Sequence, residues 1–411
     1  MLRQRKLILP LIFVAFLFLL FSQALSLEKK EDTFRALKIF SQIFRLIEEN
    51  YVTEVNPKEL IFGAIEGMLS SLDPYSSLLK PEEFKELEIE TKGSFTGIGI
   101  EITIKDDILT VVAPIEDTPA WKAGLKPGDR ILKIDDKSTK GMKITEAVKL
   151  LRGPKGTSVK LTILRNEKDV FEVTIIRDVI PIKSVKTKLL EPGYGYVRIS
   201  QFQEKTLEEL VEALKKLEKE TELKGIVLDL RNNPGGLLSS AVEVSDEFLE
   251  NGTIVSIKGR TPSNQMEFKA TPNPQNRKHR YPIAILINHG TASAAEIVTG
   301  ALKDNKRAVV IGEKSFGKGS VQTVIPIEDN YAVRLTTAYY YTPSGININK
   351  QGIKPDFEIP QMELAKKESP HEKLSREEQT LSRFSSPEED FQVKMALNIL
   401  KNIAVISQIR Y

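Results

Sequence analysis

The sequence predicts an α/β multidomain protein, because three different spacings of apolar residues follow one another along the chain. Helical spacing comes first, short strands separated by turn residues come next, and strands alternating with helices come last. At 411 residues the chain can hold two or three domains, each with its own core. The predicted parts are an export segment at 1–26, a helical region at 27–92, a β-rich module at 93–178, an α/β domain at 179–360 and a terminal segment at 361–411.

The first 26 residues have the pattern of an export signal. The basic segment MLRQRK precedes an apolar stretch at residues 7–21, and the small residues Ala24 and Ser26 suit a signal-peptidase site. The apolar stretch is short for a membrane-spanning helix, which needs about 20 residues. A cleaved signal peptide is therefore favoured over an uncleaved membrane anchor, and either one predicts a periplasmic or otherwise extracytoplasmic protein.

The composition excludes several classes of protein. Hydrophobic residues make up 41% of the chain and charged residues 28%, as in ordinary globular proteins. The net charge of +3 gives no general attraction to nucleic acid. The chain has no cysteine, which excludes disulfides, a thiol nucleophile and a cysteine-based metal site.

The first two globular regions differ in their periodicity. In residues 27–92 the apolar residues have helical spacing, and Asn56 followed by Pro57 predicts the start of a second helix. We interpret this region as a packing module. Residues 93–178 contain five short strands and the helix KITEAVKLLRG, separated by turns such as KPGD and RGPKGT. This pattern predicts a small, mostly antiparallel barrel or sandwich.

The third region alternates strands with helices. Its predicted strands are YGYVRIS, GIVLDLR, TIVSIKG, PIAILIN and RAVVIGE, and they are almost wholly apolar. Such strands indicate a parallel sheet covered by helices, to which YAVRLTTAYYYTPSG adds antiparallel strands. After a charged linker, the apolar helix EDFQVKMALNILKNIAVI is predicted to dock on its own domain or on a partner rather than on a membrane surface.

Three loops follow predicted strands at the edge of the sheet where ligands bind in α/β folds. They are RNNPGG at 231–236, NHGTAS at 288–293 and GEKSFGKGSVQ at 312–322. Paired glycines before a helix suit an oxyanion hole, because their backbone N–H groups can approach a ligand closely. A phosphate site is the alternative, but the chain contains no G-x-x-x-x-G-K-[ST] motif.

Ser293 has two interpretations. It stands three residues before Glu296, which is the pattern of a helix capping box, and it could also be a nucleophile at a helix N-terminus. A serine nucleophile needs a base. The three histidines, His279, His289 and His371, have no evident carboxylate partner, which argues against a Ser-His-Asp triad. Lys318, between two glycines, is a candidate base if burial keeps it neutral, the alternative being a surface lysine.

These motifs together resemble the C-terminal processing peptidases, also called tail-specific proteases, over nearly the whole chain after the export segment. EGMLSSLDPYS resembles the family's N-terminal helical signature, and FTGIGIEI with APIEDTPAWKAGLKPGDRILKID resembles a PDZ domain. GIVLDLRNNPGGLL, NHGTASAAEI and GEKSFGKGSVQ resemble the three catalytic motifs. The resemblance implies a crotonase-like α/β protease core with an inserted PDZ domain and an N-terminal helical region.

Residue by residue, the resemblance implies a Ser-Lys dyad. Ser293 matches the nucleophile, Lys318 the general base and Gln322 the glutamine that orients the lysine, whereas Lys314 does not match. Glu296 and Asp304 match acidic positions for which we expect structural roles. Ala295 departs from the family pattern, in which relatives often carry serine at this position. We do not expect this difference to affect catalysis.

The oxyanion hole is expected, on geometric grounds, to use the backbone N–H groups of Gly235 or Gly236 and of Ala294. The PDZ resemblance implies a carboxylate-binding loop at TGIGI, which contains Gly97, Ile98, Gly99 and Ile100. A bound peptide would then add as a strand beside GIEITI. The candidates for the side-chain pocket are Ile98, Ile100, Val148 and Leu151, with ordinary core positions as the alternative.

The sequence thus predicts an exported serine endopeptidase that binds the C-terminal end of unfolded or flexible protein substrates. No cofactor or metal is implied. One alternative is a non-catalytic PDZ scaffold for C-terminal peptides, and another is a crotonase-like acyl-transfer enzyme or lyase, which the PDZ motif and export segment disfavour. A homodimer through the terminal helices and a regulatory partner are further candidate interactions.

Overall fold

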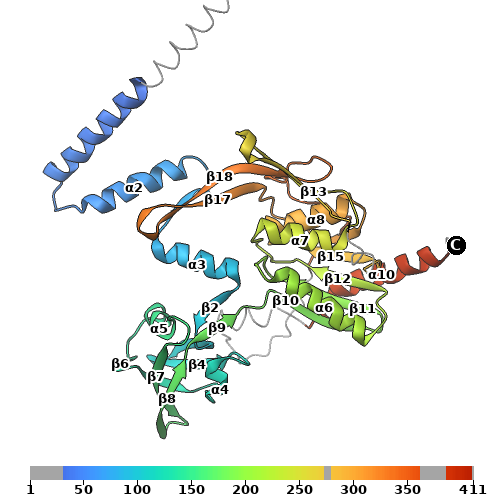
Figure 1. Ribbon diagram of the computed structural model, residues 1–411, viewed down its shortest axis with the longest axis horizontal. Coiled ribbons are helices and arrows are strands. Elements are labelled where there is room, and N and C mark those ends of the chain that lie inside the picture. Colours follow the sequence, from blue (N-terminus) through green and yellow to red (C-terminus); the bar gives the residue numbers. More distant parts are fainter. Residues whose placement is uncertain (1–30, 273–278, 362–385, 410–411) are drawn as a thin grey trace, which may run out of the picture. The chain divides into compact units, whose positions relative to one another are not determined.

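The computed structural model describes residues 31–272, 279–361 and 386–409 (Figure 1). The export segment, His371 and most of the charged linker therefore lie outside the described residues. The chain divides into two compact units, residues 1–78 and residues 79–411, and each is described by itself. Within the described ranges, no helix is both long enough and apolar enough to cross a membrane.

The first unit is helical, as the periodicity predicts. A helix covers residues 31–50, and α2 (Pro57–Ser70) follows it. Asn56 is the N-cap of α2, where its side chain accepts a hydrogen bond from the N–H of Lys58 at 3.0 Å. In the next turn, the carboxylate of Asp73 accepts hydrogen bonds from the backbone N–H groups of Tyr75 and Ser76.

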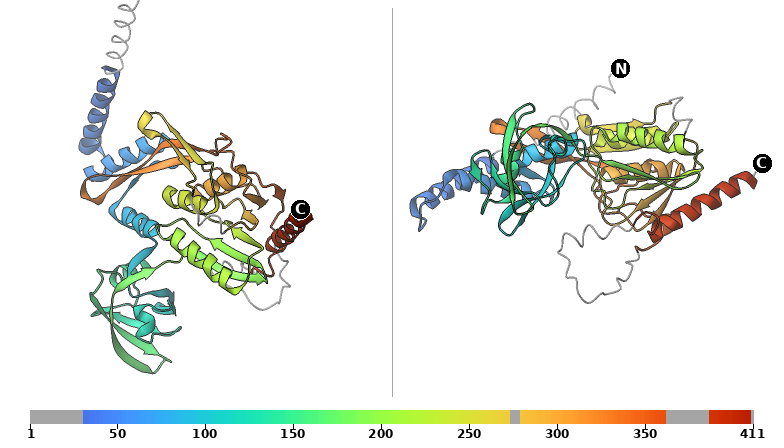
Figure 2. Two further views of the ribbon diagram at one scale, coloured as in Figure 1. Left: turned by 45° about the vertical axis from the view of Figure 1, so that its right-hand side comes forward. Right: turned by 90° about the horizontal axis from the view of Figure 1, so that it is seen from below.

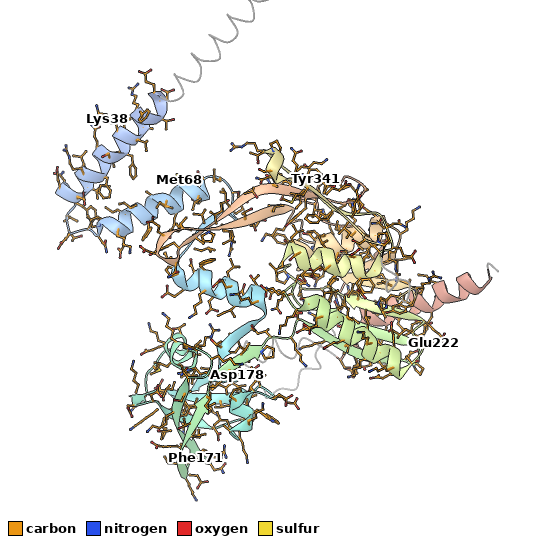
Figure 3. The ribbon with its side chains drawn as sticks, in the orientation of Figure 1. Lys38, Met68, Phe171, Asp178, Glu222 and Tyr341 are labelled. Carbon is orange, nitrogen blue, oxygen red and sulfur yellow. The ribbon has the colours of Figure 1, made fainter. Side chains whose placement is uncertain are left out.

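The second unit begins with a β-rich module whose main sheet is antiparallel, in the order β3-β4-β5-β7-β8. Strand β3 lies at the edge of this sheet, and the helix α5 packs against it. In Figure 3, Phe171 marks β8, where the guanidinium of Arg165 lies 5.0 Å from its ring. The short strand β1 (Ser77–Leu79) lies at the boundary of the two units and is not part of this module. The elements from there to the end of the module are α3 (Pro81–Lys92), β2 (Ser94–Gly97), β3 (Ile100–Lys105), β4 (Ile108–Pro114), α4 (Pro119–Lys122), β5 (Arg130–Ile134), β6 (Lys137–Ser138), α5 (Ile144–Leu151), β7 (Ser158–Arg165), β8 (Asp169–Ile176) and β9 (Asp178–Pro181).

The α/β domain is built on a sheet in the order β10-β11-β12-β15-β16-β19. All neighbouring strands are parallel except β10, which is antiparallel to β11. Strands β12 and β15 are buried along their whole length, as expected for central strands covered on both faces. The strands are β10 (Val185–Glu191), β11 (Tyr194–Ile199), β12 (Gly225–Asp229), β15 (Ile283–Ile287), β16 (Ala308–Gly312) and β19 (Phe357–Glu358).

The two faces of this sheet carry different helices. Alternate residues such as Ile226 and Leu228 pack on one face with α6 (Thr206–Glu220), α7 (Leu238–Phe248) and α8 (Ala294–Asp304). The residues between them, such as Val227, pack on the other face with α10 (Phe391–Ile409). The right-hand view of Figure 2 shows α10 on the opposite side of the sheet from α7 and α8. The terminal helix was predicted to dock on its own domain or on a partner, and the structure shows the first of these alternatives.

One predicted strand belongs to a different sheet. TIVSIKG forms β13 (Thr253–Gly259), which pairs antiparallel with β14 (Gln265–Lys269) and β18 (Ala332–Tyr341) rather than joining the parallel sheet. β18 also pairs with β17 (Ser320–Pro326) in a hairpin that follows the third loop. Tyr341, labelled in Figure 3, lies at the end of β18, where the ammonium of Lys258 is 4.5 Å from its ring. An alternating apolar strand does not by itself specify its sheet, because both sheets offer a buried face.

Candidate active site

The three predicted loops do meet beyond the carboxyl ends of β12, β15 and β16. The N–H of Ala292 donates to the carbonyl of Asn233 at 2.9 Å, which joins the second loop to the first. The N–H of Phe316 donates to the carbonyl of Thr291 at 2.9 Å, which joins the third loop to the second. The hydroxyl of Thr291 also donates to the carbonyl of Leu230. Backbone bonds of this kind fix the three loops as one unit.

Asparagine side chains complete this unit, and the sequence analysis did not single them out. Asn288 accepts from the N–H of Asn232 and donates to its side-chain oxygen, both at 2.9 Å. Asn233 is buried and bridges the carbonyl of Ile199 and the N–H of Gly235. The sequence feature that could have identified them is their position directly after apolar strands. Short polar side chains in such turns form hydrogen bonds with the backbone.

Ser293 occupies the sharp turn between β15 and α8. Its φ and ψ are 54° and −117°, in a region that a residue with a side chain rarely adopts. Such strain persists only where the surroundings fix it, and it is common at catalytic turns. The N–H of Ser293 donates to the carboxylate of Glu296 at 2.8 Å, as the S-x-x-E pattern predicts. The backbone geometry at Ser293 is therefore more specialised than that of an ordinary helix cap.

The paired glycines lie directly against this serine. A side chain at Gly235 would place its first carbon 2.7 Å from the Cβ of Ser293, so only glycine fits there. The N–H of Gly235 donates to the side chain of Asn233 at 2.9 Å. The N–H groups of Gly236 and Ala294 donate to no other described residue. Of the three expected oxyanion donors, Gly236 and Ala294 therefore have their N–H groups unengaged.

Glu296 links the loop at residues 288–293, which carries Ser293, to the loop at residues 312–322, which carries Lys318. Its buried carboxylate binds the N–H of Ser293 at 2.8 Å and the N–H of Lys318 at 2.9 Å through the same oxygen, Oε2. Its other oxygen accepts from the hydroxyl of Ser315 at 2.5 Å and the N–H of Gly317 at 2.7 Å. Because both N–H groups bind the same oxygen, the backbone nitrogens of Ser293 and Lys318 lie no further apart than the sum of these two hydrogen-bond lengths.

The environment of Lys318 favours its neutral form. Partial burial lowers the pKa of Lys318 from its ordinary value, and the positive charge of Arg334 on β18 lowers it further. The negative charge of Glu296 acts in the opposite direction but does not cancel these effects. A lowered pKa increases the share of neutral lysine, which is the form that can act as a general base.

The remaining predicted residues of these loops have varied surroundings. Gln322 is half-buried on β17, and its amide donates to the hydroxyl of Ser320 at 2.9 Å. Lys314 is exposed. The carboxylate of Asp304, at the end of α8, binds the N–H and hydroxyl of Ser344 at 3.0 and 2.7 Å. This bond supports the structural role that was expected for Asp304.

One expectation about the histidines is wrong. His279 is buried, and it does have carboxylate partners. Its ring nitrogens lie 3.0 Å from Glu218 and 2.9 Å from Glu247, and the hydroxyl of Tyr281 is 3.0 Å from Nδ1. These contacts occupy both ring nitrogens of His279 in bonds between secondary-structure elements. His289, close to Ser293 in sequence, is exposed.

The β-rich module offers a second site along the edge of β3. The N–H groups of Ile98 and Gly99, just before this strand, donate to no other described residue. A side chain at Gly99 would lie 2.4 Å from Thr118, which keeps the loop tight. Ile98 and Leu151 are buried in the core of the module, whereas Val148 is only half-buried. Among the proposed pocket residues on α5, Val148 is therefore the more accessible one.

Comparisons with known proteins match three parts of this chain. Residues 193–359 match the model of peptidase family S41, residues 110–165 match a PDZ domain, and residues 22–82 match the activating protease CtpB N-terminal domain. The match to a peptidase family, on a sheet edge that carries a strained serine, makes the protein a serine-type peptidase with a PDZ domain.

The relatives define the family more closely. A carboxy-terminal-processing protease of Bartonella bacilliformis is 46% identical over 85% of this chain and 81% of its own length. The carboxy-terminal processing protease CtpA of Bacillus subtilis is 40% identical over 79% of this chain and 69% of its own. A solved photosystem II D1 C-terminal processing protease is 31% identical over 78% of this chain and 92% of its own, with a TM-score of 0.45. By its sequence relatives, the chain belongs to the carboxy-terminal processing proteases of family S41.

We predict that Glu296→Gln lowers kcat/KM by roughly 100-fold or more and destabilises the fold by about 2–3 kcal/mol, because an amide cannot accept from all four donors. Steady-state kinetics and denaturant unfolding measure the two effects. Asp304→Asn, at the other end of the same helix, is the matched control and should keep kcat/KM within a few fold. Wild-type kinetics in Glu296→Gln would contradict the role of this carboxylate.

We predict that kcat/KM rises with pH through the pKa of Lys318, because the base must be neutral. Arg334→Gln removes a positive charge that lowers this pKa, so the rise should move to higher pH. Arg334→Lys keeps the charge and should leave the profile close to that of the wild type. A pH profile of kcat/KM for the three proteins is the measurement, and an unmoved profile in Arg334→Gln would exclude this electrostatic effect.

Proposed function

We propose that this protein is an exported endopeptidase that captures the free C-terminal end of unfolded or flexible proteins and cleaves them with a Ser293–Lys318 dyad. The observation that carries the proposal is the single oxygen of Glu296 that binds the backbone N–H of both residues. This contact holds the two loops together, and the lowered pKa of Lys318 provides a base.

The geometry is consistent with acyl transfer through a covalent intermediate. Neutral Lys318 takes the proton of the Ser293 hydroxyl as the serine oxygen attacks the peptide carbonyl carbon. The carbonyl oxygen becomes an oxyanion, which the N–H groups of Gly236 and Ala294 stabilise. The lysine ammonium then gives its proton to the leaving amine, and water hydrolyses the acyl-enzyme by the same steps. In this proposal, Gln322 orients the side chain of Lys318.

The PDZ module supplies substrate capture in this proposal. The N–H groups of Ile98 and Gly99 bind the terminal carboxylate, and the peptide adds as a strand to the free edge of β3. The helix α5 closes the groove, with Val148 and Leu151 beside the last side chain. Only a flexible chain end can enter as an extended strand, which restricts substrates to unfolded or loosely folded termini.

Localisation and assembly complete the proposal. The basic and apolar segments at residues 1–26 support export, with anchoring by residues 7–21 as the alternative to cleavage. A homodimer through the terminal helices is supported, at the N-terminal end, by the exposed apolar side chains Phe34, Leu37, Phe40 and Ile43. Cell fractionation and light scattering of the purified protein test these two points. A cytoplasmic or strictly monomeric protein would contradict them, and a regulatory partner would be sought by the same fractionation.

We predict that Ser293→Ala and Lys318→Ala each lower cleavage of an unstructured reporter by roughly 10⁴-fold or more, because nucleophile and base act as a unit. Lys314→Ala changes an exposed lysine of the same loop and is the matched control, with activity near that of the wild type. Product formation is followed by mass spectrometry. Robust cleavage by either dyad variant would contradict the mechanism and would leave the non-catalytic scaffold as the better description.

We predict that amidating the C-terminus of a peptide reporter raises KM at least 10-fold, because the carboxylate no longer accepts from Ile98 and Gly99. Val148→Glu should likewise weaken binding of the free-acid peptide. Val170→Glu, at an exposed position on β8, is the control for a new charge in the same module. Fluorescence anisotropy with Ser293→Ala protein measures affinity without cleavage. Equal affinity for acid and amide would exclude carboxylate recognition.

A further inference from the structure

A buried network of ion pairs lies at the end of β12. It is followed by the loop RNNPGG at residues 231–236, here called the glycine loop. Asp229, the last residue of β12, is fully buried, and its carboxylate binds the guanidinium of Arg231 at 2.7 and 3.0 Å. Arg198 of β11 donates to Asp229 at 3.1 Å and to the backbone carbonyl of Arg231 at 3.1 Å. The first residue of the glycine loop is thus held through both its side chain and its backbone.

The C-terminal segment provides the other half of this network. The Nη1 of Arg231 donates to both carboxylate oxygens of Asp390, at 3.1 and 2.9 Å, and to the side-chain oxygen of Gln392 at 2.8 Å. Gln392, in the first turn of α10, is buried and donates to the carbonyl of Ile359. Residues about 160 positions further along the chain therefore complete the hydrogen bonds of Arg231.

Asp390 adds a negative charge to this network beside Arg231. Burial alone would raise the pKa of Asp229, but the charges and hydrogen bonds of Arg231 and Arg198 hold it below its usual value. Asp390 supplies a second carboxylate to Arg231. Without it, the buried guanidinium of Arg231 would share the single carboxylate of Asp229 with Arg198, which is unfavourable for a buried charge.

The shape of the glycine loop follows from these anchors. Between Arg231 and Gly236 the chain is fixed by Asn232 and Asn233, as described above, and Gly235 lies against Ser293. A change in the position of Arg231 would be transmitted along this short loop to the N–H of Gly236. Oxyanion stabilisation depends on donors held in place before the reaction.

We propose that Asp390 is a positioning residue for peptide hydrolysis, which holds Arg231 so that the glycine loop presents the N–H of Gly236 to the oxyanion. The C-terminal helix is then a structural part of the active site rather than a packing element alone. This inference rests on the proposed dyad mechanism.

The test compares full-length Asp390→Ala, Asp390→Asn and Asp390→Glu with wild type. Asp390→Ala should lower kcat about 10- to 100-fold with KM changed less than about threefold, since the loss falls on the transition state. Asp390→Asn keeps the side-chain volume and should lose less, and Asp390→Glu should recover part of kcat. The matched control is Glu388→Ala, two residues before Asp390 in the chain. This variant removes a surface ion pair with Lys188 and should keep the wild-type kcat.

A second readout separates positioning from simple stability. A peptide boronic acid forms a tetrahedral adduct on the serine, and its affinity should fall in Asp390→Ala in parallel with kcat. Peptide binding by the PDZ module should stay unchanged in the same protein. Folded Asp390→Ala or Asp390→Asn with wild-type kcat and wild-type boronic acid affinity would overturn the inference. Cleavage that persists in Ser293→Ala would instead overturn the dyad, so the two failures are distinguishable.

Discussion

The candidate active site depends above all on one buried carboxylate, that of Glu296. Its four hydrogen bonds join the turn that carries Ser293 to the loop that carries Lys318, and they replace the water that a buried carboxylate would lose. A strained serine backbone is maintained because the surrounding contacts are numerous and mutually consistent. The two residues of the proposed dyad are thus held through their backbone atoms, which keep their positions better than the ends of long side chains.

The electrostatic effects on Lys318 act in opposite directions. The carboxylate of Glu296 favours a charged Lys318, whereas burial and Arg334 favour a neutral one, and the second effect is larger. The glycine loop has a similar balance of charge, because Asp229 and Asp390 offset Arg198 and Arg231 below it. At the glycine loop this pairing of opposite charges reduces the cost of burying them.

Much of the fold was predictable from sequence patterns with a clear physical cause. Continuous apolar runs gave the central strands β12 and β15, and alternate residues of these strands pack against helices on opposite faces. The strand β13 was predicted, but its place in the second sheet was not, because strand pairing is set by long-range contacts. The burial of His279 between Glu218 and Glu247 was missed for the same reason, since those partners lie far away in sequence.

The sequence by itself determined the nature of the candidate catalytic groups: a serine at a helix start, a lysine between glycines, paired glycines before a helix, and their places after apolar strands. Only the tertiary structure decided how they are held. The shared oxygen of Glu296, the engaged N–H of Gly235 and the contact of Asp390 with Arg231 all join segments distant in the chain or depend on the local turn. Local patterns encode residue chemistry and secondary structure, whereas distances between loops emerge only when the whole domain packs.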